Sequence, residues 1–312
     1  MKKIAIIGQN LFPAPKEIPG YEIECMPGIL KKVSTLTSIL RAVIFRTTNH
    51  FRSYFYEINS IVTLCKSSDV VILHDCMPVG YLNSLMVSIQ EQTAKDTRLI
   101  LYFWNKVKGY DSLYISDRWE YITYDYNESK KYGFKYVGGF YTDISIDRVV
   151  KSDESIYFVG VDDGRFCDLR RLEAKLNAIG LLPHFEYVSP MYAILNKSYS
   201  SRIPYKSVVQ TTKSAQAILE WMKPGQSGLT LRTYEAIFYD KKLITNNKDI
   251  KRFKFYNSDN IFICDNANEA NEIKSFLEKP FNSCIYKKYK KYYSYEQWLI
   301  RLIENYETSD TL

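Results

Sequence analysis

The stretch from Gln226 to Thr245, QSGLTLRTYEAIFYDKKLIT, combines a glycine-containing turn with a helix that carries an arginine and a glutamate. Backbone N–H groups at a helix start lack intrahelical partners, and the helix dipole adds about half a positive charge there, so an anion is attracted. Arg232 and Glu235 are three residues apart and share one helix face. A carboxylate beside an anion is favourable only where it faces neutral hydroxyl groups. A phosphate linked to a sugar offers both features, and the expected contacts are Ser227, Gly228, Leu229, Thr230, Arg232 and Glu235.

A second candidate site is the segment FVGVDDGR, in which a strand ends at Gly160 and a tight turn through Gly164 leads to Arg165. The carboxyl ends of parallel strands meet at one sheet edge, so Arg165 and Arg232 are expected at the same edge. Two guanidinium groups there would clamp a diphosphate, because each presents a fork of donors. The simpler alternative is a solvated arginine in each case, with Arg232 merely paired to Glu235.

Elements of an α/β fold are expected to position these residues. Continuous β-branched runs are typical of parallel strands covered on both faces, and helical stretches lie between them. The alternation restarts in the second half, which predicts two Rossmann-like, doubly wound domains facing a central cleft, with ligands at the carboxyl ends of the strands. The expected strands are 2–8, 69–75, 98–105, 121–125, 155–160, 184–188, 215–222 and 241–245, and the expected helices are 30–45, 55–66, 79–93, 127–133, 169–180, 205–212 and 229–239.

The composition is that of a globular protein with anionic partners. The chain has 312 residues, 46% of them hydrophobic, and a net charge of +7, which favours nucleic acid, a membrane surface or phosphorylated small molecules as partners. Six cysteines without metal-type spacing read as buried free thiols, and three separated histidines give no support for a metal site. No apolar run approaches the ~20 residues that span a bilayer.

The second half resembles the nucleotide-sugar-binding domain of GT-B glycosyltransferases, especially the family 4-like enzymes of bacterial polysaccharide and lipopolysaccharide synthesis. In that family a strand ends in Gly followed by Arg, and a later Glu-Gly-x-Gly-x-x-x-x-Glu-Ala segment leads into a strand. FVGVDDGR is similar to the first motif and SGLTLRTYEAIFYDKKLIT to the second, over roughly residues 155 to 265. Ser227 stands where the family has its first Glu, and Asp240 where it has a Gly.

The resemblance implies a domain organisation and roles for the site residues. It implies an acceptor domain over 1–145, a donor-binding domain over 153–285, and a basic, aromatic C-terminal helix over 286–312 that packs back on the first domain. Arg165 would contact the donor diphosphate, and Glu235 would hold the ribose. A metal-independent transferase without a cofactor is implied, its leaving diphosphate stabilised by Arg residues and a helix N-terminus.

In the first half, polar residues follow two apolar strands. If the reaction inverts the anomeric configuration, a base is needed, and Asp75 and His74 stand where one is wanted. The simpler alternative is that both merely end a strand. By the same argument Gly8 and Gln9 would line the acceptor side.

Two basic segments suggest contact with an anionic membrane. ILKKVSTLTSILRAVIFR places Leu30, Val33, Leu36, Leu40 and Val43 on one stripe among cations, and YKKYKKYYSYEQW is basic and aromatic. A core helix and a solvated tail are the alternatives. The leading hypothesis is a cytoplasmic hexosyl- or related transferase, peripheral on the inner membrane face, that acts on a lipid-linked or glycan acceptor and binds no nucleic acid. Alternatives are a pyruvyl or glycerophosphoryl transferase of GT-B shape, or a catalytically silent binding subunit.

Overall fold

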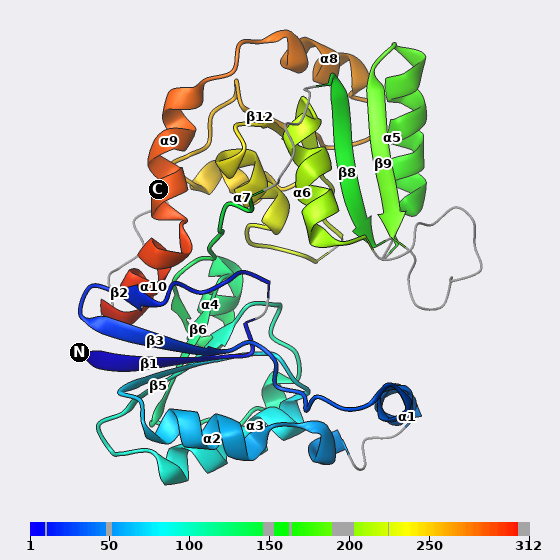
Figure 1. Ribbon diagram of the computed structural model, residues 1–312. Helices are drawn as coiled ribbons and strands as arrows, with labels where there is room; N and C mark the ends of the chain where they lie inside the picture. The colour runs from blue at the N-terminus through cyan, green and yellow to red at the C-terminus, as the bar shows by residue number, and fades with distance from the viewer. Residues whose placement is uncertain are drawn as a thin grey trace. The chain divides into compact units, whose positions relative to one another are not determined.

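The computed structural model describes residues 1–9, 11–47, 52–145, 153–161, 164–188, 203–223 and 225–304. The chain divides into two compact units, Met1–Gly138 (unit 1) and Gly139–Leu312 (unit 2), as Figure 1 shows. The division therefore falls after Gly138, and the C-terminal helices belong to unit 2. Most of the linker expected between residues 145 and 153 lies outside the described residues.

Unit 1 is built on a seven-stranded sheet in the order β2-β3-β1-β4-β5-β6-β7. Every neighbouring pair is parallel except β2 with β3. The central strands β1, β4 and β5 carry the apolar runs IAII, VVIL and LILYF, which are buried throughout, as expected for a sheet covered on both faces. The strands are β1 (Lys2–Ile7), β2 (Glu17–Ile18), β3 (Tyr21–Met26), β4 (Val70–His74), β5 (Arg98–Phe103), β6 (Trp119–Thr123) and β7 (Lys135–Tyr136).

Helices α2 and α3 run side by side along one face of this sheet (Figure 1). Alternate strand residues such as Ala5, Val71 and Leu99 share a core with them, whereas Ile6 and Ile72 point to the other face and are also buried. The helical elements of unit 1 are α1 (Thr35–Thr47), η1 (Arg52–Phe55), α2 (Ile58–Lys66), α3 (Val79–Gln92), η2 (Tyr110–Ser112) and α4 (Tyr126–Tyr132).

Helix α1 starts five residues later than the sequence predicts. Leu30 forms an antiparallel bridge with Tyr56 instead of entering the helix. The Ser34 hydroxyl accepts a hydrogen bond from the Thr37 amide at 3.3 Å, which is the interaction of an N-cap residue. The extended segment 30–34 therefore ends at a serine that starts the helix.

Unit 2 contains a five-stranded, fully parallel sheet in the order β12-β11-β10-β8-β9. Ile156 and Phe158 pack with α5 and α8 on one face, whereas Tyr157 packs with Val208 of α6 on the other. Both faces are therefore covered by helices, as a doubly wound sheet requires. The strands are β8 (Ser155–Val161), β9 (Leu182–Val188), β10 (Ala217–Glu220), β11 (Lys242–Thr245) and β12 (Ile261–Ile263).

The helical elements of unit 2 are α5 (Phe166–Ala178), α6 (Tyr205–Ser214), α7 (Leu231–Phe238), η3 (Lys248–Arg252), α8 (Ala270–Glu278), α9 (Ser283–Tyr292) and α10 (Tyr295–Glu304). Within unit 2, α10 packs on the first residues of the unit: Phe140 stacks against Tyr295 with ring centroids 4.1 Å apart and contacts Trp298 in a tilted arrangement at 4.2 Å. In the part of the chain that the structure describes, no helix is both long and apolar enough to cross a membrane.

Each sheet has one point at which the chain reverses its direction of strand addition. In unit 1 the chain adds β3 on one side of β1 and then β4 on the other, and in unit 2 it adds β9 on one side of β8 and then β10 on the other. Such switch points leave a crevice at the carboxyl ends of the two central strands, where open α/β sheets bind ligands. The two switch points therefore define where the functional sites should be sought.

Two candidate sites at the strand ends

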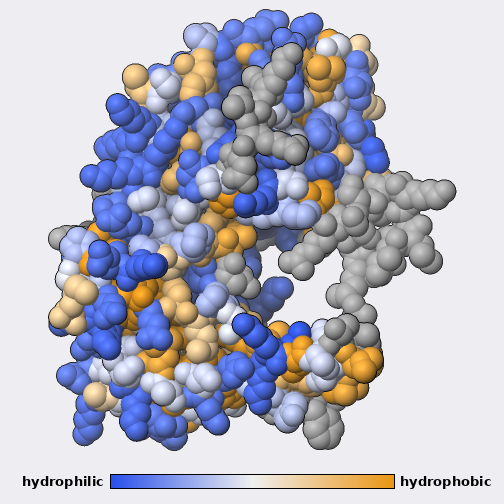
Figure 2. All heavy atoms as spheres, in the orientation of Figure 1, coloured by the Kyte–Doolittle hydropathy of each residue, from blue (hydrophilic) through white to orange (hydrophobic). Residues whose placement is uncertain are grey.

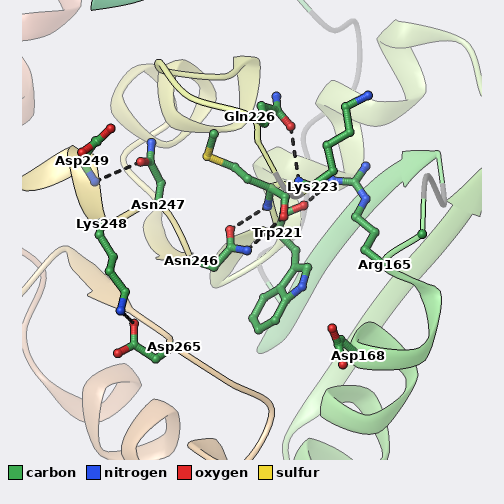
Figure 3. Close-up of a pocket in the computed structure, with 12 residues that line it drawn as sticks. Arg165, Asp168, Trp221, Lys223, Gln226, Asn246, Asn247, Lys248, Asp249 and Asp265 are labelled. Carbon is green, nitrogen blue, oxygen red and sulfur yellow. Dashed lines mark hydrogen bonds and ion pairs between the residues drawn. The ribbon is translucent and has the colours of Figure 1, made fainter. Parts of the chain in front are cut away.

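A cavity of about 450 Å³ lies at the switch point of unit 2 (Figure 3). Its walls come from the segments that follow β8, β10, β11 and β12, so it spans the carboxyl edge of the sheet. The lining residues are Gly164, Arg165, Asp168, Trp221, Met222, Lys223, Gln226, Asn246, Asn247, Lys248, Asp249 and Asp265. Its size is within the usual range for a small-molecule site.

Arg165 bridges the ends of β8 and β10 at this cavity. Its Nε and Nη2 donate to the Val161 carbonyl at 3.1 and 2.8 Å, and its Nη1 donates to the Trp221 carbonyl. The guanidinium also lies 5.3 Å from the centroid of the Phe158 ring. A Cβ atom on Gly160 would lie 2.6 Å from Nη2, so the guanidinium would have to shift if a larger residue stood there. The Gly-then-Arg pattern thus has a steric cause.

Two asparagines that the sequence analysis did not single out shape the same cavity. Asn246 accepts from the Met222 amide at 2.6 Å and donates to the Met222 carbonyl at 3.0 Å, which extends the pairing of β10 and β11 by one step. Asn247 donates to the Gly228 carbonyl at 3.1 Å and accepts from the Asp249 amide at 3.1 Å. Asn247 therefore ties the Gly228 turn to the start of η3.

Glu220, the last residue of β10, is a third position that the sequence analysis missed. It is buried, and its Oε1 accepts from the hydroxyls of Thr230 and Thr233 at 2.5 and 2.8 Å. Its Oε2 accepts from the Thr245 hydroxyl at 2.5 Å. One carboxylate thus joins the end of β10, the end of β11 and the start of α7. The sequence signal for this role was a carboxylate at the end of the apolar run AIL, followed by threonines further along the chain.

The start of α7 has the form expected of an anion-binding helix end. Thr230 is the N-cap, and its hydroxyl accepts from the Arg232 amide at 3.1 Å. Gly228 has a φ of +80°, which lets the chain turn into the helix, and Leu229 anchors the turn in the core. No described residue accepts a hydrogen bond from the amides of Leu229 and Thr230. Ser227, Gly228, Leu229 and Thr230 are not among the residues that line the cavity.

Arg232 and Glu235 lie in a buried polar cluster rather than on a solvated helix face. Arg232 Nη2 donates to Glu235 Oε1 at 2.5 Å, and the Tyr205 hydroxyl donates to the same oxygen at 2.7 Å. The Tyr205 oxygen also lies 3.0 Å from the Tyr141 hydroxyl, within hydrogen-bond distance. The Glu235 side chain is fully buried and that of Arg232 is 14% exposed. The alternative of a surface ion pair is therefore wrong.

The charges of this cluster are set by burial and by each other. Burial raises the pKa of Glu235 although Arg232 and the Tyr205 hydroxyl favour its ionised form. Burial disfavours the Arg232 charge, but Glu235 together with the hydroxyls of Tyr205, Tyr157 and Tyr141 outweighs it and raises the pKa of Arg232. Among described residues, Arg232 Nη1 and Glu235 Oε2 have no hydrogen-bond partner. Arg165 faces backbone carbonyls at the cavity, so the two arginines occupy different environments.

Unit 1 has its own cavity, of about 200 Å³, at its switch point. Gly8 follows β1 with a φ of +85°, and a Cβ atom there would lie 2.7 Å from the Cβ of Cys76. The ends of β1 and β4 can therefore approach closely only with glycine at this position. The cavity is lined by Gly8, Gln9, Leu11, His74, Asp75, Cys76, Trp104 and Asn105.

The Asp75 carboxylate faces this cavity and is held in place by the chain that follows β5. Its Oδ1 accepts from the Trp104 amide at 2.8 Å and its Oδ2 from the Asn105 amide at 3.2 Å. Burial raises the pKa of Asp75 to about 7, although these hydrogen bonds favour the charged form. Burial lowers the pKa of His74 to about 3, so His74 is neutral at physiological pH.

Gln9 supplies a buried donor to the same cavity. Its Oε1 accepts from the Phe12 amide at 3.4 Å, whereas its Nε2 has no hydrogen-bond partner among the described residues. The cavity thus combines a carboxylate that is half ionised near neutral pH with an amide donor. The carboxylate of such a pair can accept a proton from a hydroxyl group, and the amide can orient that hydroxyl group.

Comparison with known proteins supports the fold. No family model matches the chain, and no curated protein sequence is significantly similar to it. An alpha-glucosyltransferase in complex with UDP-glucose and DNA containing an abasic site is 10% identical, with 96% of this chain and 95% of that chain covered and a TM-score of 0.52. T4 phage BGT, in complex with UDP and Mn²⁺, is 15% identical, with 96% and 99% covered and a TM-score of 0.47. TarM is 9% identical, with 80% and 58% covered and a TM-score of 0.47. The chain has the fold expected from its sequence, an α/β fold of GT-B type with two Rossmann-like units.

Proposed function

We propose that the protein is a glycosyltransferase that moves a sugar, without a metal ion, from a nucleotide diphosphate sugar to a glycan or lipid-linked acceptor. The observation that carries the proposal is the cavity of unit 2, where Arg165 lies between the ends of β8 and β10. An arginine at a cavity of this size and position suits a nucleotide diphosphate. The alpha-glucosyltransferase with the same fold supports sugar transfer in general.

The donor end of the reaction rests on positive charge at unit 2. As the bond from the anomeric carbon to the diphosphate oxygen breaks, negative charge accumulates on the diphosphate. Arg165 at the cavity, with Gly160 and Gly164 around it, would stabilise that charge. The amides of Leu229 and Thr230, which start α7, would add the helix dipole to the same effect.

The buried pair would act on the donor indirectly. Arg232 and Glu235 are occupied with each other and with Tyr205, so we assign them a positioning role that fixes the orientation of α7. In this proposal Glu220 and Asn247 position the turn before α7 in the same way. The ribose role that the family resemblance implies for Glu235 would require the cluster to open.

The acceptor end rests on the cavity of unit 1. Asp75 would take the proton of the acceptor hydroxyl while the acceptor oxygen bonds to the anomeric carbon and the nucleoside diphosphate leaves. This single displacement inverts the anomeric configuration. A carboxylate with a pKa of about 7 is a stronger base than an ordinary aspartate and is still half ionised at neutral pH. His74, neutral and buried, and Gln9 would line the acceptor side with Gly8.

The acceptor class rests on the sequence resemblance to enzymes of bacterial surface polysaccharide synthesis. That resemblance favours a lipid-linked, capsule or lipopolysaccharide acceptor and a cytoplasmic protein at the inner membrane face. A pyruvyl or glycerophosphoryl transferase and a catalytically silent binding subunit are the competing hypotheses, and each would respond differently to nucleotide sugars.

Release of free nucleotide from a panel of nucleotide sugars, with and without glycan acceptors, tests the proposal. We expect turnover of one donor in the presence of chelator, and protection against thermal unfolding by UDP or GDP under the same conditions. Arg165→Ala should weaken nucleotide binding by about one to two decades, since a charge-assisted hydrogen bond contributes about 1.5–3 kcal/mol. Arg170→Ala is the matched control, because Arg170 lies on α5 in an ion pair with Glu173, and neither residue lines the cavity. Nucleotide binding without turnover would indicate a silent subunit, and a strict requirement for a divalent ion would overturn the metal-free mechanism.

A further inference from the structure

Helix α1 of unit 1 presents a row of apolar side chains to solvent. Leu36, Leu40 and Val43 are 80%, 54% and 49% exposed, and Tyr54 of the adjacent η1 is 67% exposed. Positions 36, 40 and 43 are spaced four and three residues apart, so they form one stripe along the helix. Figure 2 shows hydrophobic surface at the lower right, where Figure 1 places α1. The stripe is therefore not part of the core of unit 1.

The chain segment that carries this stripe contains charged residues of one sign only. The segment 27–56 contains five cationic residues and no Asp or Glu. Lys31 lies over the Tyr54 ring at 4.7 Å, and Arg41 donates to the Lys31 carbonyl at 3.0 Å, which holds these two cations beside the stripe. Lys32 is exposed next to them. The five cations are Lys31, Lys32, Arg41, Arg46 and Arg52.

We propose that the α1 face, defined as Leu36, Leu40, Val43 and Tyr54 with the cations Lys31, Lys32 and Arg41, docks on an anionic phospholipid bilayer. An apolar stripe enters the acyl boundary while cations meet lipid phosphates, and each feature needs the other for stable binding. A tyrosine with a lysine over its ring suits the headgroup level. Because α1 has 13 residues, it is ~20 Å long and would lie in the interface.

The other basic helix, α9, shows why a lipid is favoured over nucleic acid at α1. On α9 the cations Lys287, Lys288 and Lys291 are exposed, but its aromatic residues Tyr286 and Tyr289 are buried. A purely cationic face of that kind suits any polyanion. The α1 face adds exposed leucines, which a phosphate backbone cannot use and a bilayer can. The inference stands on this geometry alone and does not depend on sugar transfer.

Co-sedimentation of the full chain with lipid vesicles tests the proposal. We expect binding to vesicles of equal parts phosphatidylcholine and phosphatidylglycerol, little binding to phosphatidylcholine alone, and release at high salt because screening removes the attraction. Leu36→Gln with Leu40→Gln should weaken binding at least tenfold, since two inserted side chains are lost. Lys32→Glu should weaken it by about 25-fold, since each cation near the surface contributes about a fivefold factor and the reversal counts twice.

Matched control variants distinguish docking through the α1 face from non-specific binding to vesicles. Leu182→Gln removes a side chain of similar exposure, 57%, from β9 of unit 2, and Lys274→Glu reverses an exposed charge on α8. Both controls should bind vesicles as the parent protein does. Equal binding to neutral and anionic vesicles, or unchanged binding of the α1 variants, would overturn the proposal. Loss of duplex DNA binding by Lys32→Glu with vesicle binding intact would also overturn it, in favour of nucleic acid. Nucleotide-sugar turnover without vesicles is a separate readout, so failure here leaves the proposed activity testable.

Discussion

The charge state of Asp75 gives a prediction that can be measured without knowing the substrate. Asp75 is half-buried at the end of β4, and the loss of solvation there raises its pKa from the ordinary value of 3.8 to about 7. Asp75→Asn replaces the carboxylate by a neutral group of the same shape. The side-chain oxygen of the new asparagine can still accept a hydrogen bond from the Trp104 backbone amide. Its side-chain nitrogen cannot accept one from the Asn105 backbone amide, so that hydrogen bond is lost. The second effect costs about 1 kcal/mol at every pH.

The dependence on pH carries the test. A carboxyl group with a raised pKa in the folded state contributes stability below its unfolded pKa, and that contribution is lost as pH rises through the folded pKa. Between pH 3.8 and about 7 the free energy of unfolding should therefore fall relative to that of Asp75→Asn. At about 1.4 kcal/mol per unit of pH, the wild type loses about 3 kcal/mol relative to the variant between pH 5 and pH 8.

Urea unfolding of wild type and Asp75→Asn at pH 5 and pH 8 measures this difference. His74 cancels in the comparison, because both proteins contain it. Glu91→Gln, an exposed carboxylate on α3, should run parallel to the wild type at both pH values. If Asp75→Asn also runs parallel to within about 0.5 kcal/mol, the pKa of Asp75 is not raised and the base assigned to the acceptor side loses its support. If the assignment holds, turnover should rise with pH to a plateau above about 7 and fall by at least a hundredfold in Asp75→Asn.

Three further predictions concern unit 2. Gly160→Ala should displace the Arg165 guanidinium and weaken nucleotide binding by about tenfold, measured by calorimetry; unchanged affinity would remove Arg165 from the donor site. Arg232→Met leaves the Glu235 carboxylate without its cationic partner in the interior, so urea unfolding should show that the free energy of unfolding falls by about 3–5 kcal/mol. If the variant is instead stable but binds nucleotide more weakly, Arg232 and Glu235 belong to the donor site. Glu220→Gln should lower the melting temperature and nucleotide affinity together, because it loosens the start of α7; intact affinity in a destabilised protein would limit Glu220 to a structural role.

The strands could be predicted well because their signal is local. Runs such as IAII and VVIL are apolar at every position, which only a strand buried on both faces requires, and β1 and β4 fall where these runs lie. Strand β3, which lies between β1 and the short edge strand β2, was not predicted. Its sequence YEIECM places Glu22 and Glu24 on an exposed face, so it lacks the continuous apolar run that identified the others. The expectation of buried thiols is wrong for Cys25, Cys167 and Cys284, which are exposed.

The residues that organise the site could be predicted only in part. Glycine and arginine in FVGVDDGR stand out in sequence, and the steric contact between Gly160 and Arg165 explains that pattern. Glu220 and Asn247 do not stand out, because their partners Thr230, Thr245 and the Gly228 carbonyl become neighbours only when β10, β11 and α7 meet at the sheet edge. Such contacts depend on strand order, which local spacing does not encode.

For the buried pair of Arg232 and Glu235, the family resemblance and the local structure indicate different roles. The motif places Glu235 at the position of a ribose ligand, and its spacing from Arg232 equally suits a helical ion pair. In the structure Glu235 is fully buried, and Arg232 and Tyr205 both donate to its Oε1. Glu235 Oε2 and Arg232 Nη1 have no hydrogen-bond partner among described residues. Burying a polar atom without such a partner destabilises the folded protein. A ligand hydroxyl that reached these two atoms would accept from one and donate to the other, which matches a ribose but requires the tyrosines to yield. The geometry therefore favours a positioning role for the pair, and it names the contacts that must open if Glu235 is to bind the nucleotide.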